Sequence, residues 1–341
     1  MKTLFVVDDN DINLVNAENA LSEQYNVITM SSAAIMFDLL DKITPDLILL
    51  DIMMPEMDGL EALRLLKSKE GSASIPVILL TSRNDAVTEA RGFEMGAIDF
   101  ISKPFSTLVL PNRIKAHLDI EGMIRERTEK LLKLQNGIVS VLANMVETRD
   151  KLTGRHIERT TGYINMLLKE MLDRGVYSDE LKNWNLDLIV SSARLHDVGK
   201  IAVSDVLLNK PGRLTPEEFE LIKTHTAEGE KIIDNIISES GDEVFLRNAK
   251  LFAGYHHERW DGTGYHRGLK GEEIPMQGRI MAIVDVYDAL TSERPYKSEL
   301  THEEAVGIII KGRNKHFDPN IINVFIEVCD IFKKMDQGAG F

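Results

Sequence analysis

Polar side chains follow four of the short apolar runs in the first 120 residues. They are Asp8, Asp9, Asp51, Thr81 and Lys103. In an open parallel sheet, groups at successive strand ends meet at one edge, where ligands bind. Clustered carboxylates repel one another unless a hard cation lies among them, so the set predicts a Mg²⁺ site. Asp51 could then attack a phosphoryl donor, while Mg²⁺, Thr81 and Lys103 neutralise the phosphate oxygens.

The second half of the chain carries a different set of reactive side chains. Eight of the nine histidines lie beyond residue 150, several of them beside carboxylates, as in His196-Asp197 and His256-His257-Glu258. Imidazole and carboxylate without thiolate suit Fe, Mn, Zn or Ni. A shared aspartate can bridge two such ions, and a bridged pair lowers the pKa of a trapped water for attack on phosphorus. Lys200, one helical turn beyond His196, would place a cation beside the phosphate oxygens.

The elements that would position the first set are strands alternating with helices. Runs of Val, Ile and Leu without polar alternation are typical of strands covered on both faces. Strand–helix alternation predicts βαβ units and a parallel sheet. The expected strands are Leu4–Val7, Val27–Met30, Leu47–Leu50, Val77–Leu80 and Ala97–Ile101.

The rest of the chain reads as helices. Residues 112–147 have apolar side chains at a three-four spacing, interrupted by Arg127, which predicts one long helix. This helix either packs on its own domain or serves as a signalling or dimer helix. Beyond residue 148 the expected helices lie at Ile157–Met171, Leu186–Leu195, Phe219–Ile237, Ile280–Leu290, Ala305–Ile310 and Ile321–Phe332. The predicted domains are therefore an α/β domain at 1–120, a connecting helix at 121–147 and an all-α domain at 148–335.

Composition limits the classes of function. The 341 residues include 40 basic and 54 acidic side chains, a formal net charge of −14, which argues against a nucleic-acid polymer as partner. Cys329 is the single cysteine, so disulfide scaffolds and thiolate zinc sites are excluded. The first residues are too briefly apolar for a signal peptide, and no run approaches the length of a membrane helix. We expect a cytoplasmic protein that does not enter a membrane.

Residues 1 to about 120 resemble a response-regulator receiver domain. The matching stretches are Val7–Asn10, Asp51–Gly59, Thr81-Ser82 and Lys103–Phe105. The resemblance implies a flavodoxin-like five-stranded sheet and phosphorylation of Asp51 by a sensor histidine kinase. It also implies Mg²⁺ at Asp8, Asp9 and Asp51, and a switch through Thr81, Phe100 and Lys103. On chemistry alone, Phe100 could equally be a plain buried aromatic.

Residues from about 140 to 330 resemble the HD-GYP family, a branch of the HD phosphohydrolases that degrades cyclic di-GMP. The matching stretches are Glu147–Arg159, His196–Lys200, His225, His256–Tyr265, Gly268–Pro275 and Asp285–Tyr296. The resemblance implies two divalent ions, with Fe or Mn favoured over Zn or Ni, and a bridging role for Asp197. It assigns substrate contacts to Lys200, Arg294 and Lys297, with Asp197 and Lys200 as catalytic residues. The implied metal ligands are His156, His196, Asp197, His225, His256, His257 and Asp285.

Two positions depart from the family pattern. The usual Gly-Tyr-Pro reads Gly264-Tyr265-His266. The replacement of proline by His266 either has no functional effect or alters the contact of the loop with substrate. Leu152 stands where some members carry a glutamate ligand, so we expect a binuclear site, with Glu147 and Asp150 structural. Tyr265 could stack on a guanine or pack on the helical core. His302 and His316 are expected at the surface.

The sequence thus predicts a two-component response regulator whose output domain is a metal-dependent cyclic di-GMP phosphodiesterase, controlled by phosphorylation of Asp51. A homodimer through the connecting helix would be compatible with its apolar spacing. The alternatives are a catalytically weak module that binds cyclic di-GMP or a partner, and a phosphohydrolase for another nucleotide. The complete ligand set and Lys200 favour the enzyme, because binding alone would not require an activated water.

Overall fold

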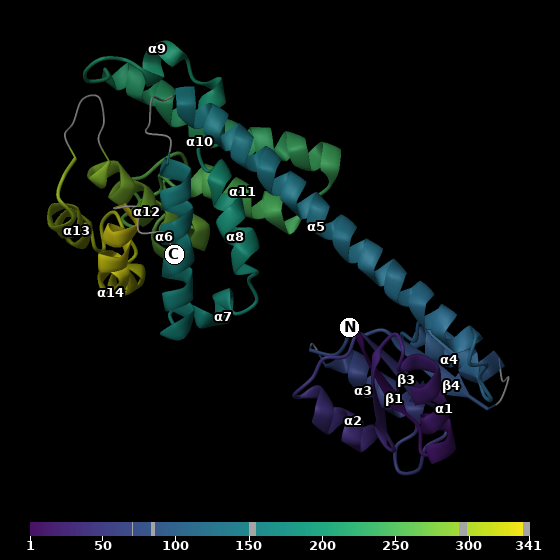
Figure 1. The fold of residues 1–341 in the computed structure, drawn as a ribbon. Helices are drawn as coiled ribbons and strands as arrows, with labels where there is room; N and C mark the ends of the chain where they lie inside the picture. Colours follow the sequence, from purple (N-terminus) through teal and green to yellow (C-terminus); the bar gives the residue numbers. More distant parts are fainter. Residues whose placement is uncertain (70, 83–85, 150–154, 293–298, 337–341) are drawn as a thin grey trace. The chain divides into compact units, whose positions relative to one another are not determined.

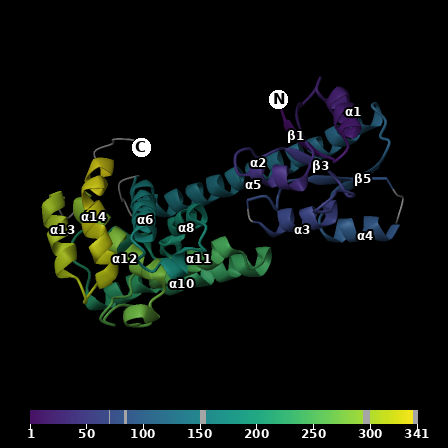
Figure 2. The ribbon, with the colours of Figure 1, turned by 90° about the horizontal axis from the view of Figure 1, so that it is seen from below.

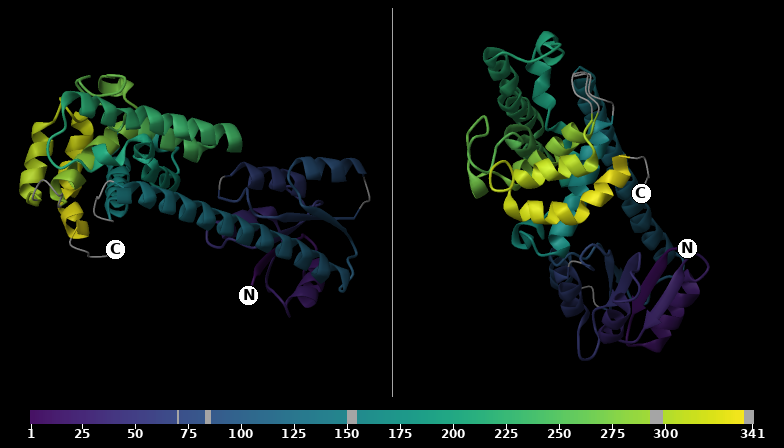
Figure 3. Two further views of the ribbon diagram at one scale, coloured as in Figure 1. Left: turned by 90° about the horizontal axis from the view of Figure 1, so that it is seen from above. Right: turned by 90° about the vertical axis from the view of Figure 1, so that its left-hand side faces the viewer.

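The computed structural model describes the chain except for residues 70, 83–85, 150–154, 293–298 and 337–341 (Figure 1). Its contacts divide the chain into two compact units, Met1–Lys130 and Leu131–Phe341. The long helix α5, Val109–Arg149, runs without a break from the first unit into the second (Figure 3). The predicted boundaries after residues 120 and 147 both fall inside this helix. Among the described residues, none of the helices combines the length and apolarity needed to cross a bilayer.

The first unit is built on a five-stranded parallel sheet in the order β2-β1-β3-β4-β5. The expected strands and the flavodoxin-like order are confirmed, with every strand end within two residues of its predicted position. The strands are β1 Thr3–Val7, β2 Asn26–Met30, β3 Leu47–Asp51, β4 Val77–Thr81 and β5 Asp99–Ser102.

Helices cover both faces of this sheet because successive side chains of each strand point to opposite faces. Phe5 and Val7 face α2 (Ala33–Leu40) and α3 (Gly59–Ser68), whereas Leu4 and Val6 face α1 (Asp11–Leu21) and the start of α5. The helix α4, Ala86–Glu94, packs on β4 and β5 on the same face as α3, where a side chain on Gly92 would meet Phe100. This double cover leaves the carboxyl ends of the strands as the open edge for chemistry.

The described part of the second unit is helical, as predicted, with only two isolated β-bridges. Figure 2 shows these helices as a bundle. The α-helices are α6 His156–Asp173, α7 Ser178–Leu181, α8 Leu186–Ser192, α9 Asp205–Leu208, α10 Pro216–Ser240, α11 Val244–Tyr255, α12 Met276–Thr291, α13 His302–Lys311 and α14 Pro319–Asp336, and the 3₁₀ turns are η1 Ala193–Leu195, η2 Val198–Ala202 and η3 Gly271–Glu273.

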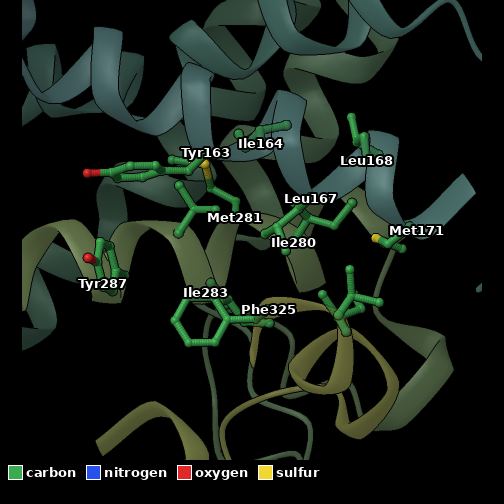
Figure 4. Close-up of a cluster of buried hydrophobic side chains, with 14 of the residues drawn as sticks. Tyr163, Ile164, Leu167, Leu168, Met171, Ile280, Met281, Ile283, Tyr287 and Phe325 are labelled. Carbon is green, nitrogen blue, oxygen red and sulfur yellow. The ribbon is translucent and has the colours of Figure 1, made fainter. Parts of the chain in front are cut away.

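The core of this unit lies where α6, α12 and α14 pack together (Figure 4). Tyr163 of α6 stacks on Phe332 of α14 at 4.2 Å between ring centroids and meets Tyr287 of α12 edge to face. All three rings are fully buried, and aromatic pairs of this kind add about 0.5–1.5 kcal/mol beyond their burial. The core therefore fixes the positions of α6 and α12. The predicted ligand His156 is the first residue of α6, and the predicted ligand Asp285 lies within α12.

Two local expectations differ from the structure. Leu186–Leu195 was expected as one helix, but α8 ends at Ser192 and the 3₁₀ turn η1 follows, so that the chain turns tightly into His196. The helix α11 was not expected as an element, although its apolar residues include Phe245, Leu246 and Phe252. Both departures place histidine ligands at helix ends rather than along a helical face.

Candidate metal centre and receiver site

The receiver edge gathers the predicted charges around one ammonium group. Lys103 Nζ lies 2.7 Å from Asp8 Oδ2 and 2.7 Å from Asp51 Oδ2. Carboxylate oxygens of Asp8, Asp9 and Asp51 lie within 4.8 Å of one another, close enough to share one cation. Thr81 ends β4, and its carbonyl accepts the backbone N–H of Lys103 at 2.7 Å. The five residues predicted from the strand ends are thus brought to one edge.

Asp51 is nearly inaccessible, with 2% of the residue exposed. Burial raises the pKa of its carboxyl group against the opposing hydrogen bond from Lys103. Gly59 starts α3 directly beside this residue, and a Cβ there would lie 2.1 Å from the Asp51 carbonyl oxygen. Glycine at this position lets α3 pass close to the end of β3 and keeps Asp51 at the mouth of the site.

Phe100, the third predicted switch residue, lies in β5 with 8% of its surface exposed. Its ring packs edge to face on Phe93 of α4, at 4.8 Å between centroids. The structure therefore shows a buried aromatic that links β5 to α4, and its role in switching stays a prediction.

In the second unit, seven predicted ligands come together from five different parts of the chain. The ligands lie at helix ends, in the η1–η2 turn and inside two long helices. His156 begins α6, His196 and Asp197 lie between η1 and η2, His225 is in α10, His256 and His257 follow α11, and Asp285 is in α12.

The ligand atoms form two groups. His156, His196 and Asp285 make one group, and His225, His256 and His257 make the other, each within 4.8 Å. Asp197 faces both groups: its Oδ2 lies 3.4 Å from His196 Nε2, and its Oδ1 lies 3.6 Å from His225 Nε2 and 3.7 Å from His256 Nε2. One carboxylate between two triads is the arrangement that a bridged pair of ions requires.

Hydrogen bonds on the outer ring nitrogens show that these histidines suit metal ions. The Nδ1 atoms of His196, His225 and His256 lie 2.7–3.0 Å from backbone carbonyl oxygens of Ala193, Ile222 and Phe252. A carbonyl oxygen only accepts, so each Nδ1 must donate, and in the neutral ring Nε2 carries a lone pair.

The Nε2 atoms of these rings lie close together in pairs. His225 Nε2 and His256 Nε2 are 3.2 Å apart, and His156 Nε2 and His196 Nε2 are 3.3 Å apart. Two unprotonated nitrogens at this distance repel each other unless a cation binds both. The donor set therefore fits a divalent ion in each triad.

Burial keeps the imidazoles of His225 and His257 neutral, and the groups around Asp197 keep its carboxyl group charged. Burial lowers the pKa of His225 to about 4, and burial with the neighbouring imidazoles lowers the pKa of His257 well below its usual range. Burial opposes the charge of Asp197, but Lys200 and His196 outweigh it and hold the pKa of Asp197 well below its usual range. Burial opposes the charge of His156, but the hydrogen bond and charge of Asp288 outweigh burial and raise the pKa of His156. Near neutral pH His225 and His257 thus offer neutral nitrogens and Asp197 an anionic bridge, which are forms that bind metals.

Lys200 supplies the cation at the edge of this centre. Its Nζ lies 2.8 Å from Asp197 Oδ2. The approach depends on Gly199, where a Cβ would lie 1.9 Å from the carbonyl oxygen of His225. Glycine there lets η2 pack against α10, so that the turn carrying Asp197 and Lys200 reaches the histidines of the second triad.

Comparison with known proteins agrees with this geometry. Residues 4–115 match the response regulator receiver domain, and residues 140–321 match the HD domain, more than half of the chain. A probable cyclic di-GMP phosphodiesterase of Vibrio cholerae is 38% identical over 95% of this chain and 77% of its own. The chain belongs to the cyclic di-GMP phosphodiesterase family of HD-domain response regulators.

Two further relatives extend over both units. A cyclic di-GMP phosphodiesterase of Thermotoga maritima is 33% identical over 97% of this chain and 93% of its own. The cyclic di-GMP phosphodiesterase response regulator RpfG of Xanthomonas campestris pv. campestris is 34% identical, over 86% and 80% respectively. The order of receiver and HD domain is therefore shared along most of the chain.

In this HD-domain response regulator, the loop after the second triad is anchored by a buried carboxylate. Glu258, with 1% of its surface exposed, accepts the backbone N–H groups of Arg267, Gly268 and Leu269 at 2.7–3.2 Å. The Tyr265 ring lies 4.8 Å from the His257 ring, between centroids. Tyr265 thus packs on the protein, and its stacking on a guanine stays a prediction.

His266, at the position of the family's usual proline, ties this loop to α10. Its Nδ1 lies 3.1 Å from Thr226 Oγ1, and its Nε2 lies 3.3 Å from Glu230 Oε2. Arg267 pairs with the same Glu230 carboxylate at 2.8 and 3.0 Å. A proline could make neither side-chain contact. His266 therefore adds polar contacts to α10 where the family's usual proline would restrict the backbone.

Two further carboxylates support the HD-domain centre: Asp288, which was not singled out from the sequence, and Glu147, which was expected to be structural. Asp288 Oδ2 lies 2.7 Å from His156 Nδ1, and Asp288 also binds the guanidinium of Arg159. Glu147 Oε1 accepts the backbone N–H of His156 at 3.0 Å. Asp285 and Asp288 are one turn apart on α12, a spacing that could have indicated a shared face. Four residues named from the sequence, Asp150, Leu152, Arg294 and Lys297, lie outside the described residues.

The expectation that His302 and His316 are surface residues is wrong. His302 has 9% of its side chain exposed, and its Nδ1 lies 2.8 Å from the Tyr287 hydroxyl group. His316 stacks on Phe317 at 4.2 Å, and burial lowers its pKa to about 4. His302 contacts an aromatic residue on another helix, and His316 contacts its neighbour in the sequence. The spacing of these histidines in the sequence does not distinguish them from exposed histidines.

Proposed function

We propose that this chain hydrolyses a phosphodiester bond of cyclic di-GMP at a binuclear metal centre. The observation that carries the proposal is Asp197, whose two oxygens face two separate ligand triads. The curated relatives that cover most of the chain are named as cyclic di-GMP phosphodiesterases, which supports this substrate.

The chain's own residues divide the work of the reaction. Divalent ions held by the triads and Asp197 would lower the pKa of water and supply a nucleophile near neutral pH. Carbonyl acceptors on Nδ1 orient three of the imidazoles and leave Nε2 free for binding. Lys200, beside Asp197, is placed to neutralise a phosphate oxygen as negative charge develops. We also propose that Tyr265 contacts the substrate. The family resemblance implies the same role for Arg294 and Lys297.

Asp197→Asn tests the proposal directly. The amide keeps one oxygen acceptor but loses the charge shared by the two triads, so we expect turnover of cyclic di-GMP to fall by about 10²-fold or more. Purified, metal-loaded protein should be assayed by separating linear dinucleotide and GMP from the substrate. Near-normal turnover by this variant would reject the bridging role.

The same assay separates the enzyme from the binding module. Wild-type protein that binds cyclic di-GMP and holds two metals, yet gives no product, would support an effector. The positive control is the wild-type chain of a hydrolysing relative under the same metal loading. We favour the enzyme because three donors and a shared carboxylate for each ion leave coordination positions open for water and phosphate.

We further propose that a sensor histidine kinase regulates the chain by phosphorylating Asp51 in the presence of Mg²⁺. Support comes from the Asp8, Asp9 and Asp51 oxygens, which lie close enough for one cation, and from Lys103 at 2.7 Å. A carboxylate oxygen of Asp51 would form the new bond to phosphorus while the donor histidine leaves. Lys103 would then move from the carboxylate to the phosphate oxygens.

The apolar spacing of the connecting helix supports a homodimer of this regulator. Ile124, Leu131, Ile138 and Met145 follow one another at intervals of seven residues on α5. Each is more than half exposed. A repeat of seven residues on one helix is typical of a two-stranded coiled coil.

A further inference from the structure

The last residue of α5 lies against the turn that carries the bridging carboxylate. The 3₁₀ helix η2 starts directly after Asp197 and includes Lys200, so this one short element places both side chains. A 3₁₀ helix of five residues is held weakly by its own hydrogen bonds, and the carbonyl groups at its end need donors from elsewhere. Arg149, at the end of α5, supplies those donors.

The Arg149 guanidinium group binds a row of backbone carbonyl oxygens at the end of η2. Its Nη1 donates to the carbonyl oxygens of Ile201 at 3.0 Å and Lys200 at 3.3 Å. Its Nη2 donates to the carbonyl oxygen of Val203 at 3.1 Å. Because the guanidinium is planar and its N–H groups point in fixed directions, it holds these three carbonyl groups in one arrangement.

The guanidinium group is itself held by the segment that follows η2. Asp205 Oδ1, at the start of α9, lies 2.9 Å from Arg149 Nε and 2.8 Å from Arg149 Nη2. The backbone carbonyl oxygen of Arg149 accepts the side-chain N–H of Asn209 at 2.8 Å. The side chain and the main chain of Arg149 are therefore both fixed, so the guanidinium group is oriented before it meets η2.

We propose that Arg149 is a positioning residue of the metal centre, which holds the carboxyl end of η2 and thereby keeps Asp197 and Lys200 in place. Gly199 packs η2 against α10 near its start, and Arg149 fixes the opposite end. The contacts of Arg149 with η2 go to backbone carbonyl groups, so it acts through the turn and touches neither metal nor substrate. Its effect on catalysis rests on the proposed function, whereas its effect on the turn does not.

Amide hydrogen exchange of the full chain tests the effect on the turn without metal or substrate. The Lys200 N–H donates to the Asp197 carbonyl oxygen at 2.9 Å, and the Val203 N–H donates to the Lys200 carbonyl oxygen at 3.0 Å. In Arg149→Ala, exchange in the peptide that spans residues 197–203 should be at least about tenfold faster than in the wild type, because η2 opens more often.

Arg174→Ala is the matched control for this measurement. Arg174 also lies at the end of a helix and pairs with a carboxylate, that of Glu170. It follows α6 at the end opposite His156, so its removal should leave exchange in residues 197–203 at the wild-type rate.

Recovery by added guanidinium tests the effect on catalysis. Turnover of cyclic di-GMP by Arg149→Ala at saturating metal should fall by about 10–100-fold, because a misplacement of about 1 Å costs roughly that much. Guanidinium chloride at about 20 mM, far below the molar concentrations that unfold proteins, should recover at least about fivefold of this loss. Methylammonium chloride should not, and Arg149→Lys should stay impaired, because a point charge cannot bridge several carbonyl groups.

Asp205→Asn keeps the proposal testable if Arg149→Ala does not fold. Its side chain is 66% exposed, so the fold should tolerate the change, while the guanidinium group of Arg149 loses its charged partner. Exchange in residues 197–203 should then rise by about 2–5-fold, less than in Arg149→Ala.

Three results would overturn the proposal. They are wild-type exchange of residues 197–203 in a folded Arg149→Ala or in Asp205→Asn, equal acceleration in Arg174→Ala, and a loss of turnover that guanidinium does not recover. A wild-type chain that holds metal but never hydrolyses cyclic di-GMP would instead refute the proposed function. The exchange results would still decide the role of Arg149 in the turn, so the two failures are distinguishable.

Discussion

Replacing Asp288 by asparagine should weaken metal binding although Asp288 is not among the proposed ligands. The carboxylate is almost fully buried, with 1% of the residue exposed, and accepts from His156 Nδ1 at 2.7 Å. Burial opposes its charge, but the hydrogen bonds from His156 and Arg159 outweigh burial and lower the pKa of Asp288. The ionised carboxylate thus fixes the Nδ1–H form of His156 and makes Nε2 a stronger donor to a metal.

The size of the effect follows from what asparagine retains. The side chain is isosteric, so the packing of α12 on α6 should survive. One oxygen becomes an NH₂ group, and the negative charge opposite Arg159 is lost. Loss of such an outer partner typically costs 10–100-fold in metal affinity, or about 1.4–2.7 kcal/mol. If the NH₂ group turns toward His156, the ring must accept at Nδ1 and protonate Nε2, which places the effect at the upper end.

The assay is a metal titration by equilibrium dialysis with elemental analysis, followed by turnover at saturating metal. Asp173→Asn, an exposed change of the same kind at the opposite end of α6, is the control and should bind as the wild type does. We expect excess metal to restore much of the activity of Asp288→Asn. Wild-type metal affinity in Asp288→Asn would refute the reasoning.

Three more outcomes are expected. Asp51→Asn should abolish labelling by acetyl phosphate with Mg²⁺ and keep basal hydrolysis, which mass spectrometry and the product assay would check. His266→Ala should raise KM about 2–10-fold with a smaller change in kcat, because it loses contacts to Thr226 and Glu230 of about 0.5–1.5 kcal/mol. His316, with a folded pKa of about 4 against about 6.5 unfolded, contributes stability above pH 6.5 that is lost as pH falls. The free energy of unfolding, measured by urea melts, should therefore fall less between pH 7 and pH 5 in His316→Gln than in the wild type, by up to about 2 kcal/mol.

The sheet could be predicted closely from the sequence for a physical reason. Strands covered on both faces, such as Leu47–Asp51, are continuous apolar runs whose ends are marked by the polar residues of the site. Helices of the second unit were less well bounded, because the change from α8 to η1 at Ser192 preserves the apolar pattern. Hydrogen bonding, which spacing does not report, decides where such a helix ends.

The candidate site shows the same division. Residue types indicated a metal site rich in histidine and carboxylate, and the family resemblance nominated the seven ligands and their roles. The supporting carboxylates were not found, because Asp288 and Glu258 act on groups far away in sequence or on backbone N–H groups. Asp288 binds His156 across 132 positions, a pairing that only the tertiary packing of α6 on α12 creates. His302 was misplaced for the same reason, since its partner Tyr287 lies on a different helix.

Charge balance argues for two ions rather than three at the proposed centre. Two divalent ions bring four positive charges, and the carboxylates of Asp197 and Asp285 offset two of them. The remainder, with Lys200, suits a substrate that carries one negative charge on each of its two phosphodiesters. A third ion would need another anionic ligand, and Glu147, the nearest described acid before His156 in the sequence, already accepts the His156 backbone N–H. Burial raises the pKa of Glu147, which further disfavours the charged form that a third ion would require.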